Sequence, residues 1–306
     1  MIAAINELVN LEQADMQRLM IPVTSRTSIT ANVLRIDKIH ATISGNKWFK
    51  LRYALQDAID NGIKNILTFG GAYSNHLLAT AYACARLGLD AVGVIRGERP
   101  ATLSETLRQC SELGMQLHFV TRELYAHKRM LYDECATIFP NAYLVAEGGA
   151  DSMGVRGAAD ILQLSANYNY THVCCAVGTG ATLAGLLNAI KPHQSVTGIS
   201  ALNMPRSDNS VNEFIQRASG GKSNYRIFYD YHFGGYARKT TQLLDFMNSF
   251  YTQTGIATDF VYTAKLFYGV MDLIEKDQFP AGSRLLIIHS GGLQGNSSLL
   301  KNSLVF

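Results

Sequence analysis

The sequence lacks the features that mark secreted, membrane-spanning and nucleic-acid-binding proteins. Its five cysteines are an odd number without a CxxC pair, and Cys174 and Cys175 lie in an apolar run, so neither a disulfide framework nor a metal site is indicated. No apolar run reaches the roughly 18 residues of a membrane helix, and no signal-like segment opens the chain. The 27 basic and 24 acidic residues leave a net charge of +3, which gives no reason to expect a nucleic-acid partner. We therefore expect a cytoplasmic protein with reduced, buried thiols.

What the sequence does contain is enough apolar side chains, 47% of 306 residues, for a large core in two lobes. Short apolar runs alternate with helical periods, which predicts an α/β fold with open, mostly parallel twisted sheets and helices on both faces. Strands are predicted at 31–36, 64–69, 90–95, 116–120, 142–145, 171–177, 195–200, 225–228 and 284–288, and an extended segment at 21–23. Helices are predicted at 6–18, 48–59, 75–87, 101–113, 123–138, 152–167, 181–190, 209–218, 240–252 and 264–276. We place a small domain at 39–147 and a discontinuous large domain at 1–38 and 148–306.

Lys47 occupies the most informative position in the chain. The stretch Ser44-Gly45-Asn46-Lys47 runs directly into a helical stripe of apolar residues that begins at Trp48 and ends at Asn61-Gly62. Lys47 therefore lies where a helix begins, and the partial positive charge there lowers the pKa of an ammonium. A lysine so placed can attack a carbonyl carbon. By spacing alone, a solvated lysine in the first helical turn is the commoner case.

The first of three candidate ligand loops is Gly70-Gly71-Ala72-Tyr73-Ser74-Asn75-His76. It follows a predicted strand, and open parallel sheets bind ligands beyond the carboxyl ends of their strands. Ser74 stands at the entry to the next helix, where the free N–H groups favour a carboxylate. The alternative is that Ser74 or Asn75 only caps the helix. His76 is a candidate general base, although a histidine at a helix start is more often a capping or core residue.

The second loop, Gly178-Thr179-Gly180-Ala181-Thr182, joins a predicted strand to a helix. Small residues at such a turn offer backbone N–H groups and two hydroxyls, which suit a phosphate. The loop is neither a P-loop nor a GxGxxG motif, so a cofactor monoester is favoured over a transferred phosphoryl group. A simple tight turn explains the pattern about as well.

The third loop, His289-Ser290-Gly291-Gly292, is paired in our interpretation with Val261-Tyr262-Thr263-Ala264-Lys265. The phenol of Tyr262 can serve in acid–base chemistry, and Thr263 offers an uncharged hydroxyl. Taken singly, each residue is better explained by capping and packing.

A reactive lysine, a phosphate cradle and a carboxylate-binding helix start together describe an enzyme that holds pyridoxal 5'-phosphate as a Schiff base. With Lys50-Leu51 after Lys47, and with Glu147-Gly148-Gly149 and Gly234-Gly235-Tyr236, the motifs resemble, in order, those of the 1-aminocyclopropane-1-carboxylate deaminase and D-cysteine desulfhydrase family. These are fold-type II pyridoxal-phosphate enzymes related to the tryptophan synthase β chain. The likeness spans residues 44–292.

The resemblance implies a role for each matching residue. Lys47 would carry the cofactor and shuttle the α-proton, Asn75 would bond the cofactor's phenolic oxygen, and Thr263 would meet the pyridine nitrogen. The residues implied to hold the cofactor are Lys47, Asn75, Gly178, Thr179, Gly180, Ala181, Thr182, Thr263 and Ser290. Those implied to contact the substrate are Tyr73, Ser74, Asn75, His76, Gly148, Tyr236 and Tyr262, of which Ser74, Tyr236 and Tyr262 would also assist catalysis. The partners implied are a small amino-acid substrate and a second copy of the chain in a homodimer.

The residue at the pyridine nitrogen favours one of the family's two activities. The resemblance implies that the deaminases have a carboxylate at this position. A carboxylate keeps the ring nitrogen protonated, which makes the ring a strong electron sink. Opening a cyclopropane ring needs such a sink, whereas a thiol leaves the β-carbon more readily. Thr263 is neutral, and the resemblance implies that the deaminases have a leucine at the position of Ser290. We therefore expect α,β-elimination from D-cysteine or a related amino acid.

Three alternatives stay open: ring opening of 1-aminocyclopropane-1-carboxylate, a pyridoxal-phosphate-binding protein without efficient turnover, and an unrelated nucleotide binder. The chain also departs from the family. Its first loop reads Gly-Ala-Tyr rather than Gly-Ile-Gln, and Trp48-Phe49 replaces a smaller polar pair. We expect the aromatic bulk of Tyr73 and Trp48 to reshape the substrate pocket.

Overall fold

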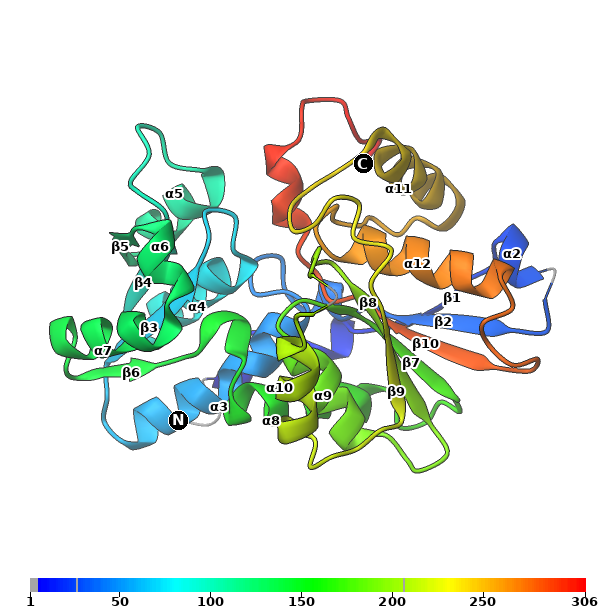
Figure 1. Cartoon of the computed structure of the whole chain (residues 1–306), viewed down its shortest axis with the longest axis horizontal. Helices are drawn as coiled ribbons and strands as arrows, with labels where there is room; N and C mark the ends of the chain where they lie inside the picture. Colours follow the sequence, from blue (N-terminus) through cyan, green and yellow to red (C-terminus); the bar gives the residue numbers. More distant parts are fainter. Residues whose placement is uncertain (1–4, 26, 206) are drawn as a thin grey trace.

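A computed structural model describes residues 5–25, 27–205 and 207–306, and it contains two sheets with helices on both faces (Figure 1). The large sheet has the strand order β1-β2-β10-β7-β8-β9, in which β1 is antiparallel to β2 and every other pair is parallel. Its strands are β1 (Met16–Arg18), β2 (Thr30–Leu34), β10 (Arg284–Ile288), β7 (His172–Val177), β8 (Ser195–Ser200) and β9 (Tyr225–Phe228). The small sheet, β5-β4-β3-β6, is parallel throughout. Its strands are β3 (Asn65–Gly70), β4 (Asp90–Arg96), β5 (Gln116–Val120) and β6 (Ala142–Leu144). The predicted α/β fold class is confirmed.

Helices cover both faces of each sheet, as the alternating pattern predicts (Figure 1). On the large sheet, α2 (Pro22–Ser25), α11 (Thr241–Thr254) and α12 (Thr263–Glu275) lie on one face, and α8 (Ser152–Ala159), α9 (Ala181–Ala189) and α10 (Ser210–Ala218) on the other. On the small sheet, α4 (Asn75–Leu87) and α5 (Glu105–Glu112) oppose α6 (Arg122–Ala126) and α7 (Lys128–Ile138). Short 3₁₀ turns complete the order: η1 (Leu11–Gln13), η2 (Ile36–Ile39), η3 (Glu147–Gly149), η4 (Asp160–Ser165) and η5 (Leu293–Ser298). Among the described residues, no helix combines the length and apolar character needed to cross a bilayer.

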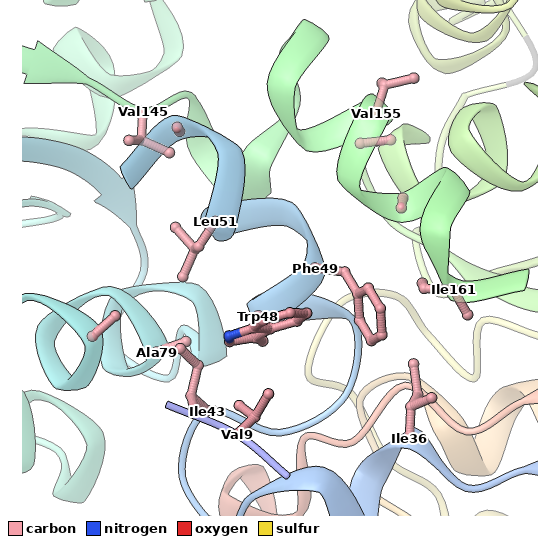
Figure 2. Close-up of a cluster of buried hydrophobic side chains, with 14 of the residues drawn as sticks. Val9, Ile36, Ile43, Trp48, Phe49, Leu51, Ala79, Val145, Val155 and Ile161 are labelled. Atoms are coloured by element: carbon pink, nitrogen blue, oxygen red, sulfur yellow. The ribbon is translucent and has the colours of Figure 1, made fainter. Parts of the chain in front are cut away.

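Helix α3 (Asn46–Asp60) links the two sheets, since it packs against α8 on one side and α4 on the other. Its first turn buries Trp48 and Phe49 completely, as an edge-to-face pair with ring centroids 5.1 Å apart. Figure 2 shows Trp48 directed toward the α4 side, near Ala79, and Phe49 directed toward Ile161 of η4. Burial of two such aromatic side chains contributes several kcal/mol. The start of α3 is therefore fixed by the core rather than by solvent-facing contacts.

The structure corrects some of the predicted elements. The helix predicted at 6–18 is replaced by η1 and by β1, whose pairing with β2 overrides local helical preference. The segment predicted as extended at 21–23 begins α2 instead, with Pro22 at its first position, where the missing N–H costs nothing. The helix predicted at 101–113 begins only at Glu105, because Ser104 caps it by accepting a hydrogen bond from the Leu107 N–H.

We propose that the two sheets form the cores of the two domains expected from the sequence, with the boundaries at residues 38 and 147. The division of the strands supports this proposal, because β3 to β6 lie in one sheet and all the others lie in the second.

Candidate active site

A cavity of about 380 Å³ lies where the carboxyl ends of strands from both sheets meet, and it collects most of the predicted residues. Those that line it are Lys47, Ser74, Asn75, His76, Gly148, Gly178, Thr179, Gly180, Thr182, Tyr236, Tyr262 and Ser290. Five helices, α3, α4, α9, α10 and α12, begin at or beside its wall. A helix start carries partial positive charge and N–H groups without helical partners. At α12 the Asp259 carboxylate already accepts from these groups, whereas the start of α9 has no side-chain cap. The cavity is therefore built to hold anionic groups.

Lys47 is the second residue of α3 and its side chain is half-buried in the cavity wall. Burial lowers its pKa to about 8, against an opposing effect from Asp259. Its Nζ donates a hydrogen bond to Asn46 Oδ1 at 2.8 Å and lies 5.8 Å from the centroid of the Tyr262 ring. A substantial fraction of the amine is therefore neutral near pH 8, which is the form that attacks an aldehyde carbon.

Gly45 explains why the chain can place Lys47 here. It has φ +64°, and a Cβ at this position would lie 1.9 Å from the carbonyl oxygen of Ser290. The Asn46 N–H points at that same carbonyl, at 3.4 Å. A glycine is therefore required, both by its left-handed backbone and by the close contact with the loop after β10.

The loop 178–182 forms an anion cradle at the start of α9. Gly180 precedes the helix with φ +88° and provides no side-chain cap, so the first N–H groups of α9 are left for a ligand. The Thr182 hydroxyl accepts a hydrogen bond from Asn46 Nδ2 at 2.8 Å, which leaves its own proton to donate. This donor set fits the phosphate of pyridoxal 5'-phosphate.

Lys50 also belongs to the cavity, although the sequence motif that contains it gave no role to this residue. It is 5% exposed, and its Nζ donates to the Gly148 carbonyl at 2.9 Å. Gly148 in turn packs on Thr179 of the cradle, since a Cβ on Gly148 would lie 3.4 Å from the Thr179 methyl group. Burial and then the neighbouring charge of Lys47 hold the pKa of Lys50 well below its usual value. A phosphate in the cradle would offset both effects and favour the ammonium form. Its spacing of three residues from Lys47, on the same helix face, was the signal available in the sequence.

Two buried acceptor atoms in the cavity wall, Asn75 Oδ1 and His76 Nδ1, have no hydrogen-bond partner within the described part of the chain. The Thr68 hydroxyl donates to the Val145 carbonyl at 2.9 Å and must therefore accept from His76 Nε2, also at 2.9 Å. This network assigns the proton to Nε2 and leaves a lone pair on Nδ1. Burial lowers the pKa of His76 to about 3, so His76 serves as a neutral acceptor rather than as a general base. Unpaired buried acceptors of this kind call for a bound ligand.

Tyr236 and Tyr262 face each other in the cavity with ring centroids 6.0 Å apart. Burial raises the pKa of both, so both remain protonated and act as donors. Lys265, fully buried on α12, holds the loop before Tyr236 by donating to the Gly235 carbonyl at 2.7 Å.

Three predicted site residues, Tyr73, Ala181 and Thr263, do not line the cavity. The expectation that Trp48 shapes the substrate pocket is wrong. Thr263 is fully buried, and its hydroxyl donates to Asp259 Oδ1 at 2.7 Å, so the expected contact with a ring nitrogen is not part of this arrangement. Tyr73 is 43% exposed outside the wall. The side chain of Ala181 is buried beneath the cradle, which leaves its backbone N–H as its contribution. Trp48 lies in the core rather than beside the substrate.

Comparison with known proteins agrees with this geometry. The family model described as "Pyridoxal-phosphate dependent enzyme" matches residues 34–291. A Pyrococcus horikoshii protein provisionally named 1-aminocyclopropane-1-carboxylate deaminase is 30% identical over 277 residues, which cover 86% of this chain and 84% of that protein. The mitochondrial bifunctional D-cysteine desulfhydrase/1-aminocyclopropane-1-carboxylate deaminase of Arabidopsis thaliana is 28% identical over 295 residues, with 86% and 72% covered. A crystal structure of an ACC deaminase homologue has a TM-score of 0.78 at 27% identity and covers 96% of this chain and 95% of its own.

The fold and the cavity define a fold-type II pyridoxal-phosphate enzyme, and the chain belongs to the pyridoxal-phosphate-dependent enzyme family. Its relatives include 1-aminocyclopropane-1-carboxylate deaminases and D-cysteine desulfhydrases, and its cofactor is pyridoxal 5'-phosphate. This assignment replaces the alternative of an unrelated nucleotide binder.

Proposed function

We propose that the enzyme catalyses α,β-elimination on a small D-amino acid, with D-cysteine converted to pyruvate, ammonia and hydrogen sulfide. The cofactor supplies an electron sink for the carbanion that forms when the α-proton leaves. The residues of the chain bind, orient and move protons around it.

The proposed roles are supported by the resemblance to the family and by the residues that line the cavity. Lys47 would hold the cofactor through its amine and would move the α-proton of the substrate. Lys50, Thr182 and the N–H groups at the start of α9 hold the phosphate, and Asn75 bonds the phenolic oxygen. The start of α4 at Ser74 binds the substrate carboxylate.

The two tyrosines and the neutral loops complete the site. Tyr236 and Tyr262 are protonated donors that face the substrate's β-carbon and its leaving group, so either can protonate a departing thiolate. Gly148 closes the cavity beside the cradle and leaves room for the substrate. His76 offers an acceptor to the bound ligand.

The observation that carries the choice of elimination is the absence of a free carboxylate near Ser290 in the described cavity wall. The carboxylates that line the cavity are Glu147, which pairs with Lys128 at 2.8 Å, and Asp208, which accepts from the Ser210 N–H. The buried Asp259 is engaged by three backbone N–H groups and the Thr263 hydroxyl. Because Thr263 does not line the cavity and Ser290 does, we propose Ser290 in place of Thr263 as the residue beside the pyridine nitrogen. Its neutral hydroxyl does not keep that nitrogen protonated. The weaker electron sink suits departure of a thiol better than opening of a carbon ring.

The test is product release from a panel of D-cysteine, L-cysteine, D-serine, β-chloro-D-alanine and 1-aminocyclopropane-1-carboxylate. We expect pyruvate from D-cysteine and from β-chloro-D-alanine, at rates above those of the other compounds. Formation of 2-oxobutyrate from 1-aminocyclopropane-1-carboxylate as the main activity would instead support the deaminase alternative, which the names of the relatives favour. A visible cofactor band without product from any compound would support a binding protein.

We further propose that the enzyme is a cytoplasmic homodimer. All five cysteines are free and buried, which supports a reducing compartment. The resemblance to the family supports the dimer, which light scattering of the purified protein tests directly.

A further inference from the structure

Arg96, the last residue of β4, is a charged cavity residue that neither the sequence motifs nor the proposed chemistry accounts for. Its guanidinium lies alongside Gly71, where a Cβ would stand 3.6 Å from Nη2. It is exposed, and it forms no ion pair or side-chain hydrogen bond within the described ranges. By contrast, the surface arginine Arg108 pairs with both Glu105 and Glu112 on its own helix. Arg96 therefore presents unused donors to the cavity.

The other charges in the cavity wall already have partners or tasks. Glu147 is paired with Lys128, and Asp208 caps the backbone before α10. Lys47 and Lys50 are assigned to the cofactor. The positive charge of Arg96 reaches across the cleft, since it lowers the pKa of Tyr236 against the effect of burial. One cation thus faces the substrate without a matching anion from the protein.

We propose that Arg96 forms a second anion subsite, so that the enzyme's preferred substrates are amino acids whose β-substituent itself carries a carboxylate or another negative charge. This inference rests on the proposed elimination and names its substrate class. The α-carboxylate occupies the start of α4 at Ser74, and the anionic end of the substituent pairs with the guanidinium beside Gly71.

Desolvation is the physical reason for the preference. Water solvates the guanidinium in the open cavity, and a substrate that fills the cavity displaces this water. A neutral substituent leaves the five N–H donors of the guanidinium unpaired, whereas a carboxylate replaces the lost hydrogen bonds with a planar, bidentate pair. An enzyme discriminates strongly between two substrates when one of them leaves a charged group of the site without a hydrogen-bond partner.

A matched pair of thioethers isolates the charge. In S-carboxymethyl-D-cysteine the Cα–H and Cβ–S bonds break, and the sulfur leaves with the bonding electron pair and takes a proton to give mercaptoacetate. One water then releases ammonia and leaves pyruvate. The amide isostere, S-carbamoylmethyl-D-cysteine, undergoes the same bond changes and gives mercaptoacetamide, but it has a neutral end of nearly the same size.

The experiment compares kcat/KM for the two thioethers in the holoenzyme. We expect the wild type to prefer the carboxymethyl compound by roughly tenfold or more, the weight of one charge-assisted pair. Arg96→Gln should collapse this ratio toward one, and Arg96→Lys should retain part of it. The preference should also shrink at high salt. Arg129→Gln, which removes an equal charge from an exposed position of α7 outside the cavity wall, should keep the wild-type ratio.

Two results would overturn the inference. A wild-type ratio near one shows that the cavity does not sense the charge. A ratio that survives Arg96→Gln while both rates fall equally shows that Arg96 binds the α-carboxylate common to both compounds.

A binding readout separates failure of the subsite from failure of the proposed reaction. The two thioethers are titrated against the cofactor's visible absorbance, which reports binding without turnover. If D-cysteine and both thioethers give no pyruvate, the elimination proposal fails. Tighter binding of the carboxymethyl compound that is lost in Arg96→Gln then still supports the anion subsite, and equal binding rejects it.

Discussion

Lys47 and Lys50 lie one helical turn apart, and the same cavity lowers the pKa of both by burial. The two amines are nevertheless suited to different tasks. Lys47 is half-exposed to the cavity and can reach an aldehyde, whereas Lys50 is tied to the Gly148 carbonyl beside the phosphate cradle. One lysine is thus suited to act as the nucleophile and the other to bind the phosphate.

The pKa of Lys47 sets the pH dependence of cofactor attachment. Only the unprotonated amine attacks the aldehyde, so the rate should rise with pH and level off above the pKa of about 8. The measurement is the return of the visible absorbance band after pyridoxal 5'-phosphate is added to the apo-protein at a series of pH values. A midpoint near the ordinary lysine value of 10.5 would contradict the burial of the amine.

Replacement of the lysine provides the control for this band. Lys47→Ala should abolish the band and lower turnover by about 10²-fold or more, because the proton-transfer group is lost. Lys64→Ala, an exposed position at the entry to β3, should leave both unchanged. A Lys47→Ala protein that keeps the band would show that another amine carries the cofactor.

At the scale of elements, the buried strands were the most predictable part of the fold, because continuous apolar runs bounded by turn residues have few other interpretations. The N-terminal segment was not predictable, since β1 exists only through its pairing with β2. The motif loops identified most of the cavity. Arg96 was missed, although it ends a strand of a parallel sheet, and Lys50 was included in the first motif without a role, although it lies one turn beyond Lys47. Arg96 belongs to no recognisable motif, so only its position at the end of a strand could have indicated it.

The close contact of α3 with the loop after β10 makes Gly45 a test of the site's framework. Gly45→Ala should lower the free energy of unfolding by about 2–5 kcal/mol, from left-handed backbone strain and from overpacking against the Ser290 carbonyl. Gly62→Ala is the matched control, because it shares a positive φ of +69° but has nothing within 4 Å. It should cost only about 1–2 kcal/mol. Urea unfolding measures both, and equal losses would rule out the steric contribution.

Lys265 of α12 fixes two loops that line the cavity, through the carbonyls of Gly235 at 2.7 Å and Ala201 at 3.5 Å. Lys265→Met should cost about 1–3 kcal/mol, because the buried carbonyls lose their donor. It should also raise KM more than the exposed control Lys276→Met, whose solvent-screened ion pair with Asp272 contributes little to stability. Faster hydrogen exchange around residue 236 would identify Lys265 as a positioning residue, and unchanged exchange there would contradict it.

At the scale of the whole molecule, the reactive amine, the phosphate cradle and the carboxylate site come from segments far apart in the chain. The cavity is complete only when α3 and the loops from both sheets are in place. Sequence order alone could not supply this convergence. The convergence was predictable from the rule that ligands bind beyond the carboxyl ends of parallel strands, because this rule applies to both sheets.

The five helix starts around the cavity have a practical consequence for work with the cofactor-free enzyme. The uncapped start of α9 does not distinguish a cofactor's phosphate from inorganic phosphate, so the buffer ion should bind in the cradle when the cofactor is removed. Reconstitution should then slow in proportion to phosphate concentration, relative to a zwitterionic buffer of equal ionic strength. Identical rates in the two buffers would mean that the cradle takes shape only around the cofactor itself.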